Sequence, residues 1–516
     1  MIGAGGLAYA DDRLDDARAH YEQAFRVLRA AGACADAARV ATLLGELHWA
    51  GLGNPSIGRG WLERAHRLLE EFGPCVEWGY WELARVACDR PDVLALERSA
   101  ERALAIADEY GDVGLQMRAL ADGGFALICQ GRLGEGFSRL EEALAVLTGG
   151  EVTDPFTAST TCCALLSACD RAGDGDRATE WLRVVRELVL DPAGGRPRML
   201  GAHCQLALGG VLCSTGRWAE AEQTIRRSLE PTAGATAAQR IEATARLGEV
   251  WIQTGNLDDA AVLLTPIEDH VAAALPLALL YLARGQPRLA AGAAQRGANT
   301  LTGDVLRQAA LLSLAVEAQL ACGDPAAAGA SAEQLRALAE KAEAPVVHGF
   351  SALADGRLIA ADGRRADAAT RFEAAAAAFA GAERAMLVAQ ARLVQAETLE
   401  SIAPEEAVAA ARAAHAAAVR FGVRPLRDRC ASLLRRLGVS APRPSSAAAA
   451  LHELTAREAD ILDGLRQGES NAQIAARVFL SPKTVEHHLS RIYAKLGVRT
   501  RAQAAALAAS SHPSGW

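Results

Sequence analysis

One short phrase recurs along this chain, and its recurrence limits the fold more than any other feature. In each copy a helix ends at a glycine, and the next helix opens with a small or apolar residue, an acidic residue and an alanine. Copies begin at Gly131, Gly175, Gly216, Gly255, Gly285, Gly323 and Gly363, those at Gly175 and Gly285 being weaker. Successive copies are 44, 41, 39, 30, 38 and 40 residues apart.

This spacing predicts a stack of helix pairs. Each step holds two helices of about 15 residues and two turns, the unit of a helical solenoid. We expect the glycine to cap the first helix in the left-handed conformation, and the alanine to let the two helices approach closely. The repeats resemble the tetratricopeptide family in a lengthened form, since its ideal period is about 34 residues. Strand patterns are nearly absent, so we expect an all-α protein.

Composition points to a folded protein outside the membrane. The chain is 51% hydrophobic and 22% charged, and its longest apolar run, Val271 to Ala283, covers 13 residues. A membrane-spanning helix needs about 20 residues. The first residues lack the basic stretch and apolar core of a signal peptide. We therefore expect a cytoplasmic location and no membrane partner.

The cysteines, histidines and tryptophans read as structural. Eleven cysteines are scattered without a CxxC pair, which favours buried reduced thiols, although adjacent Cys162 and Cys163 leave a redox pair open. Isolated histidines on helical segments, His203 and His348 among them, are expected to be satisfied core residues. Trp61, Trp78 and Trp81 are expected to fill the solenoid core.

The chain divides near its carboxyl end. Pro425 to Leu437 reads as a last amphipathic helix, and the Pro/Ser/Ala-rich segment 438–450 reads as a linker. We expect a solenoid at 1–437 with a sensor or interaction role, a second domain at 451–510 and a disordered tail at 511–516. Residues 451–509 carry a net charge of +2 and the rest of the chain −10, a balance that suits DNA binding by the terminal part alone.

Capping patterns divide the terminal domain into four helices. Thr455 and Glu458 form a capping box, Ser470 and Gln473 form a second, and Ser481 caps a third helix whose first residue is Pro482. Gly497 closes the third helix, and Thr500 caps the fourth. The short second helix turns Ile474 inward.

The third helix has two opposite faces. Val485, Leu489, Ile492 and Leu496 step by 4, 3 and 4 residues and form one apolar stripe. The other face is polar and basic. A helix of this kind, held at a fixed angle by a short preceding helix, can lie in the major groove of DNA.

Several motifs now resemble the LuxR-type helix-turn-helix in order and spacing. They are Leu454 to Glu458, Ala472 to Ala475, Ser481 to Val485, His488-Leu489, Ile492, Lys495 to Val498, and Arg501. The resemblance covers about a tenth of the chain. It implies that the third helix reads base edges of double-stranded DNA and that the fourth mediates a homodimer on an approximately palindromic site, with RNA polymerase as a further partner.

Individual roles follow from the third helix. We assign phosphate contacts to Lys483, Thr484, His488, Arg491 and Lys495. We assign base contacts to Glu486, His487 and Ser490. Many family members have a basic residue at the position of Glu486, which puts the half-site sequence in doubt, and a merely solvated Glu486 is the alternative. His487 and His488 point in different directions on a helix, so we do not expect a metal there.

No enzyme site is predicted in the long first part. An ATP-binding P-loop needs Gly-Lys-Ser/Thr, but the three lysines follow Glu340, Pro482 and Ala494. No acid–base or metal constellation is evident, so we expect no catalysis, no cofactor and no metal. The chain looks like a large regulator of the maltose-regulator group without its ATPase. Its solenoid would bind a protein, a peptide or a small-molecule effector, or mediate oligomerisation. The alternative is an interaction scaffold whose helix-turn-helix contacts protein.

Overall fold

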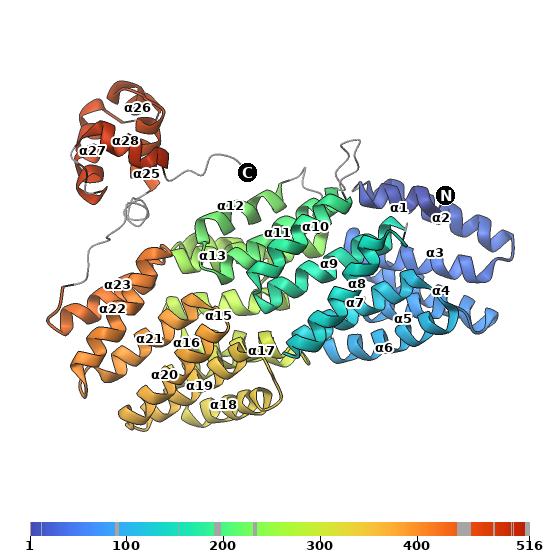
Figure 1. Cartoon of the computed structure of the whole chain (residues 1–516), viewed down its shortest axis with the longest axis horizontal. Coiled ribbons are helices and arrows are strands. Elements are labelled where there is room, and N and C mark those ends of the chain that lie inside the picture. Colours follow the sequence, from blue (N-terminus) through green and yellow to red (C-terminus); the bar gives the residue numbers. More distant parts are fainter. Residues whose placement is uncertain are drawn as a thin grey trace. The chain divides into compact units, whose positions relative to one another are not determined.

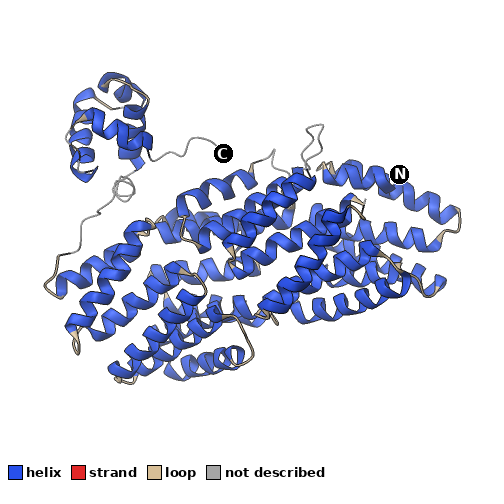
Figure 2. Ribbon diagram, viewed as in Figure 1, coloured by secondary structure: helices blue, strands red, loops and turns tan. Residues whose placement is uncertain are grey.

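The fold is all-α, as the sequence predicts. The computed structural model describes residues 2–11, 13–87, 92–152, 154–189, 198–230, 235–440, 456–477, 480–496, 498 and 500–510. Within these ranges every regular element is a helix and there is no strand (Figure 2). No helix among them is both long and apolar enough to cross a membrane.

The chain divides into two units, residues 1–391 and 392–516. The helices of the first unit, labelled in Figure 1, are α1 (Ile2–Ala10), α2 (Leu14–Ala30), α3 (Cys34–Glu46), the π-helix η1 (Leu47–Gly51), α4 (Pro55–Phe72), α5 (Glu77–Ala87), α6 (Val93–Tyr110), α7 (Val113–Cys129), α8 (Leu133–Gly149), α9 (Pro155–Ala172), α10 (Gly175–Val189), α11 (Arg198–Ser214), α12 (Trp218–Leu229), α13 (Ala237–Thr254), α14 (Leu257–Leu264), the short 3₁₀ helices η3 (Thr265–Ile267) and η4 (Val271–Ala273), α15 (Ala274–Ala283), α16 (Pro287–Thr300), α17 (Val305–Ala321), α18 (Pro325–Ala339), α19 (Pro345–Ala361) and α20 (Arg365–Gly381).

The second unit begins inside α21 (Ala385–Leu399). It continues with α22 (Pro404–Arg420) and α23 (Arg424–Arg436), which matches the last helix expected at 425–437. Ion pairs from Arg429 to Glu397 and from Arg436 to Glu400 fasten α23 to the end of α21, at 3.0 and 2.7 Å. Most of the predicted linker, from residue 441, and the predicted tail at 511–516 lie outside the described residues.

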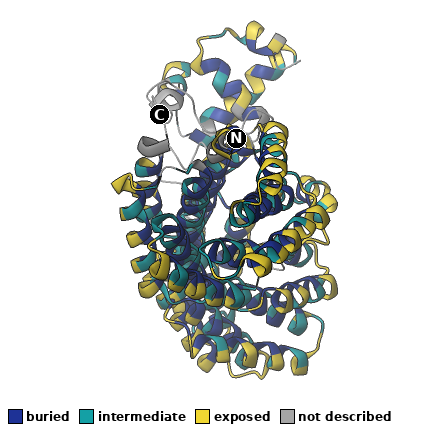
Figure 3. Cartoon of the chain, turned by 90° about the vertical axis from the view of Figure 1, so that its right-hand side faces the viewer, coloured by how far each residue is buried: buried dark blue, intermediate teal, exposed yellow. Residues whose placement is uncertain are grey.

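The first unit is built as the predicted stack of helix pairs. Each helix packs on the next one along the chain, as in the pairs α3–α4, α7–α8 and α19–α20. Helices two apart also meet, as α7 meets α9 and α17 meets α19, so each pair lies on the one before it (Figure 1). Figure 3 shows the buried positions on the faces where helices meet and the exposed positions on the outer faces. Such stacking makes the core continuous from repeat to repeat.

The repeated glycines close their helices as expected. Gly131, Gly216, Gly255, Gly285, Gly323 and Gly363 have φ of 80°, 78°, 90°, 68°, 74° and 81°. At Gly216 the glycine N–H donates to the carbonyl of Cys213 and the next N–H donates to that of Leu212, at 3.1 and 2.8 Å. This pair of bonds is the Schellman motif, which satisfies carbonyls that the helix end leaves open.

One of the weaker copies was misplaced. The left-handed residue is Gly173, with φ of 69°, whereas Gly175 is the first residue of α10. The phrase also follows a packing rule, as expected: its small residue lies five positions after each of these left-handed glycines and is buried, which lets the two helices approach closely. These residues are Gly136, Ala178, Ala221, Ala260, Ala290, Ala328 and Ala368. Gly32 with Ala37 and Gly53 with Gly58 obey the same rule nearer the amino terminus.

The tryptophans, histidines and cysteines that were predicted to be structural lie in packed or hydrogen-bonded positions. Trp61, Trp78 and Trp81 pack against the hydrophobic cluster of the first helices. His203 Nε2 lies 3.0 Å from the carbonyl oxygen of Cys163, and His348 Nε2 lies 3.0 Å from that of Ala342. The cysteines that the structure describes are free thiols, Cys162 and Cys163 included, and no cluster that could hold a metal is found in the same residues.

Gly363 and Gly329 offer a test of the turn geometry. An added Cβ would meet nothing within 4 Å at either position, but only Gly363 has a positive φ. Gly363→Ala should cost about 1–2 kcal/mol, because an alanine is strained in the left-handed region. Gly329→Ala lies inside α18 and should gain about 0.5–1 kcal/mol. Urea unfolding followed by circular dichroism checks the two shifts, and equal shifts would contradict this account of the turns.

Candidate nucleic-acid interface

The terminal domain is a compact set of four helices around one core. They are α25 (Ala456–Arg466), α26 (Asn471–Arg477), α27 (Pro482–Leu496) and α28 (Arg501–Ser510). α25 packs on the other three, and α26 packs on α27. The core residues, each at most 7% exposed, are Ile461, Leu462, Leu465, Ile474, Ala475, Val485, Leu489, Ile492, Leu496 and Ala504.

Side-chain caps set where the helices begin. Ser470 Oγ accepts from the N–H of Gln473 at 3.3 Å, and Gln473 Oε1 accepts from the N–H of Ser470 at 2.8 Å, which completes a capping box. Ser481 Oγ accepts from the N–H of Thr484 at 3.1 Å. Thr500 Oγ1 does the same for Gln503 at 3.2 Å. Thr455 and Gly497, the other predicted boundary residues, lie outside the described residues.

The turn between α26 and α27 is held by the backbone and by the core. The N–H of Leu480 donates to the carbonyl of Ala475 at 2.9 Å, and the Leu480 side chain packs against the core cluster. Val485, one turn into α27, is fully buried. These contacts fix the angle at which α27 leaves α26, as a helix-turn-helix requires.

The outward face of α27 carries most of the residues assigned to DNA. Lys483, Glu486, His487, Ser490 and Arg491 are exposed. Among the described residues, no hydrogen bond or ion pair engages the side chains of Lys483, His487 and Arg491. Ser490 Oγ already donates to the carbonyl of Glu486 at 3.1 Å, inside its own helix. A ligand would therefore meet mainly basic and imidazole groups on this face.

Two assigned residues lie at the edge of that face and are half-buried. Thr484 Oγ1 lies 2.7 Å from Ser481 Oγ, so it contributes to the cap. His488 has its Nδ1 buried with no hydrogen-bond partner in the described part of the chain. Only the other ring nitrogen of His488 is left for an outward contact.

Lys495, assigned to a phosphate, takes part in an ion pair inside the domain. Its Nζ lies 2.5 Å from Glu458 Oε2, and the Glu458 side chain is only 5% exposed. The pair ties the end of α27 to the start of α25. Lys495 therefore offers less free charge to DNA than its position on the helix suggests.

Two further arginines hold the domain together and were not singled out as site residues. Arg477 Nε donates to Glu469 Oε2 at 3.0 Å and its Nη2 donates to the carbonyl of Asp460 at 2.8 Å. Arg501 Nη1 donates to Asn471 Oδ1 at 2.8 Å, and its Nη2 donates to the carbonyl of Glu469. The turn after α25 is thus latched to α26 and α28. Helical periodicity does not reveal such contacts, because the partners belong to different elements.

Comparison with known proteins places this domain. Residues 452–508 match the family described as bacterial regulatory proteins, luxR family. The probable transcriptional regulatory protein SgaR of Hyphomicrobium methylovorum is 53% identical over 57 residues, which are 11% of this chain and 27% of that protein. YhcZ of Bacillus subtilis, an uncharacterized transcriptional regulatory protein, is 49% identical over 57 residues, with the same coverage of 11% and 27%.

A third relative, the DNA-binding transcriptional activator DevR/DosR of Mycobacterium tuberculosis, is 48% identical over 58 residues, again 11% of this chain and 27% of that protein. The chain thus spans about a quarter of the length of the curated relatives it matches. Residues 452–508 are a luxR-family helix-turn-helix, and the relatives that share it are transcriptional regulators.

Two solved structures show a distant likeness over most of the chain. A monomeric mutant of IFIT1 with Gppp-AAAA gives a TM-score of 0.38 at 13% identity, covering 78% of this chain and 90% of that one. The human IFIT1 dimer with m7Gppp-AAAA gives 0.32 at 16% identity, covering 82% and 96%.

The Lys495–Glu458 pair is testable by substitution. Lys495→Met removes the cation that faces a buried carboxylate, and should destabilise the domain by about 1–3 kcal/mol. Lys483→Met is the matched control, since its side chain is exposed, and should stay within about 0.5 kcal/mol of the parent. Hydrogen exchange of the α25 and α27 amides in the full chain measures both. If the two variants exchange alike, the ion pair does not hold the domain.

Proposed function

We propose that this chain is a sequence-specific DNA-binding transcriptional regulator with α27 lying in the major groove. The observation that carries the proposal is the two-faced helix. Its stripe of Val485, Leu489, Ile492 and Leu496 is buried, while Lys483, His487 and Arg491 are exposed on the other side. That helix belongs to the segment that matches the luxR family. A polar and basic helix at a fixed angle to its neighbour suits groove binding.

Lys483 and Arg491 make the principal phosphate contacts in this proposal. Both are exposed cations, near the start and in the third turn of α27, and a helix start also presents free N–H groups to an anion. Thr484 and His488, at the edge of the face, add weaker contacts. Lys495 reaches a phosphate only if it leaves Glu458.

Glu486, His487 and Ser490 read the bases. Their side chains are exposed along one side of α27, between the two phosphate anchors. A glutamate can accept from the N4 amino group of cytosine, and an imidazole can donate to or accept from a base edge. Ser490 must give up its bond to the carbonyl of Glu486 or accept a hydrogen bond instead.

The solenoid, residues 1–437, regulates the activity of the DNA-binding domain in this proposal. The helix pairs of residues 1–437 form the part that receives a protein, a peptide or a small molecule, or that joins copies of the chain. The domain at 451–510 binds DNA as a homodimer and contacts RNA polymerase, in the cytoplasm. Two observations support this division, the stack of helix pairs in the described part of the first unit and the confinement of the luxR-family match to residues 452–508.

Replacing the phosphate anchors should weaken binding to every DNA sequence. Lys483→Ala and Arg491→Ala each remove one phosphate contact per chain and two per homodimer, so each should lower the slope of log affinity against log salt by about 2. Fluorescence anisotropy with specific and random duplexes, at several salt concentrations, measures the effect. Lys341→Ala, an exposed lysine on the solenoid, is the control and should bind as the parent does.

Replacing His487 should instead change which DNA sequence the chain prefers. His487→Ala is expected to cost about 1–3 kcal/mol on the preferred site and little on random DNA, because only a base contact is lost. Selection from a random duplex library shows which base pair is relaxed. A parent chain that binds no DNA, or binds all DNA alike, would favour the scaffold alternative.

A further inference from the structure

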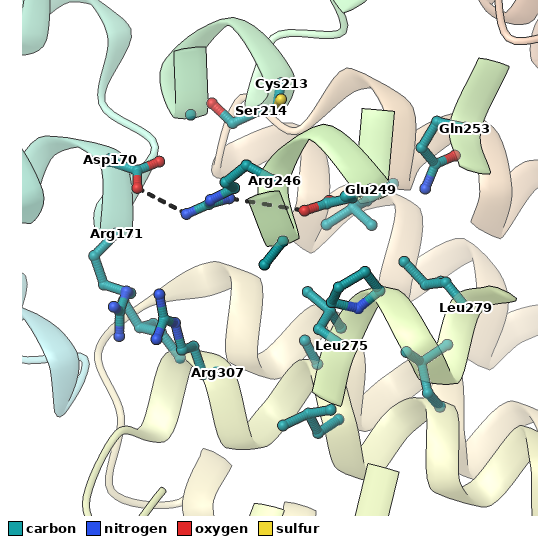
Figure 4. Close-up of a pocket in the computed structure, with 18 of the residues that line it drawn as sticks. Asp170, Arg171, Cys213, Ser214, Arg246, Glu249, Gln253, Leu275, Leu279 and Arg307 are labelled. Carbon is teal, nitrogen blue, oxygen red and sulfur yellow. Dashed lines mark hydrogen bonds and ion pairs between the residues drawn. The ribbon is translucent and has the colours of Figure 1, made fainter. Parts of the chain in front are cut away.

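A cavity lies inside the first unit, between helices far apart in the sequence. Its volume is about 260 Å³, whereas one buried water needs about 10–15 Å³. The residues that line it come from α9, α11, α12, α13, α15, α17, α19 and α21 and from the turns beside them, and Figure 4 draws part of this lining. A space of this size within a packed solenoid exceeds what packing defects leave.

One wall of the cavity is charged. Arg246 on α13 bridges Asp170 at 2.7 Å and Glu249 at 3.8 Å (Figure 4). Arg307 on α17 pairs with Glu242 at 2.6 Å. Burial alone would raise the pKa of Glu242, but the charges of Arg307, Arg246 and Arg171 together outweigh it and hold that pKa at about 2. Burial raises the pKa of Glu249, which weakens its negative charge. Of the two glutamates, Glu242 is therefore held ionised and Glu249 less so.

The residues that line the cavity also have more unpartnered hydrogen-bond donors than acceptors. In the described part of the chain, Arg171 Nε, Trp218 Nε1 and Arg384 Nε are buried donors without a partner, against one such acceptor, Asp170 Oδ1. Arg384 donates from Nη2 to the carbonyl of Ala172 at 2.6 Å, yet in those same residues no carboxylate pairs with it. Burial lowers the pKa of Arg384. A buried donor without a partner costs about 1–3 kcal/mol, so this arrangement calls for an acceptor.

The opposite wall is apolar. Leu275 and Leu279 of α15 point toward the cavity across from Arg246 and Glu249 (Figure 4). They are only half-buried, although their neighbours Leu277 and Leu280 on the same helix are buried. Phe350 of α19 and Leu387 of α21 complete this side. Convergent polar groups facing an apolar wall are typical of a small-molecule site.

We propose that the cavity binds a small organic acid with an apolar body, its carboxylate at Arg384, Trp218 and Arg171 and its body against Leu275, Leu279 and Phe350. Because unpartnered donors outnumber acceptors in the lining, the cavity favours a ligand whose polar group carries oxygen acceptors. Arg171, Arg246 and Arg307 already pair with carboxylates, Arg171 with Asp304. Arg384 is the one arginine of the lining without such a partner in the described residues, so a ligand with a single negative charge is the best match. A neutral polyol would leave the leucine wall without a partner.

Such a ligand would be the input of the proposed regulator, and this inference rests on the proposed function to that extent. Leu387 and Gln390 of α21 line the cavity, and α21 runs on into the second unit as far as Leu399. The ligand also lies where Arg384 reaches the carbonyl of Ala172, a contact between residues 212 positions apart. A bound ligand would therefore strengthen the contact between Arg384 and Ala172, next to α21, the helix that continues into the second unit.

Isothermal titration of the full chain without DNA tests the proposal. The probes are hexanoate, octanoate and decanoate, with octanamide as the neutral match for octanoate. We expect at least one acid to bind with a stoichiometry of one per chain, and octanoate to bind about tenfold more tightly than octanamide. Arg384→Gln should remove that difference and leave octanamide binding unchanged. Leu279→Trp should abolish binding of every probe by filling the apolar end.

Arg288→Gln is the matched control, since Arg288 is exposed on α16 and lies outside the cavity lining. Circular dichroism and hydrogen exchange show that each variant is folded. The proposal is overturned if no acid binds, if octanamide binds as tightly as octanoate, or if Leu279→Trp binds as the parent does. DNA binding is measured separately, so a failed titration with intact DNA binding leaves the proposed function standing.

Discussion

The constraint on which this structure depends is the pairing of a left-handed glycine with a small residue five positions later. The glycine stops one helix through the two hydrogen bonds of a Schellman motif. The small residue lies in the following helix and lets that helix approach the one before it closely. At Gly58, for example, an added Cβ would lie 2.8 Å from the carbonyl oxygen of Gly45. Because this pair of residues recurs along residues 1–391, an alanine-rich chain with few aromatics still buries a continuous core.

Local patterns predicted much of the fold. The glycine steps and the apolar stripes predict the helix pairs and α25 to α28, because helix periodicity and caps depend on residues a few positions apart. The ion pair of Lys495 with Glu458 was missed for the opposite reason, since it joins residues 37 positions apart. Gly175 was chosen over Gly173 because both stand beside the same turn and only backbone geometry separates them.

The cavity could not be predicted in the same way. Its polar atoms come from helices whose sequence separation reaches 212 residues, as between Ala172 and Arg384. Its buried charges look like ordinary surface charges in the sequence, because arginine and acidic residues occur together on most of the helices. Only the packed arrangement shows Arg384 without a carboxylate and Leu279 facing a charged wall. The candidate DNA interface was more predictable, since one helix carries nearly all of it.

In the proposed function, α27 makes this chain bind to particular DNA sequences. Footprinting of the purified full chain on fragmented genomic DNA tests it most directly. The account predicts discrete protected sites with approximate two-fold symmetry, half-sites about one helical turn (10–10.5 base pairs) apart, and occupancy that falls as salt rises. Protection spread evenly over all fragments, or no protection at low salt, would contradict it.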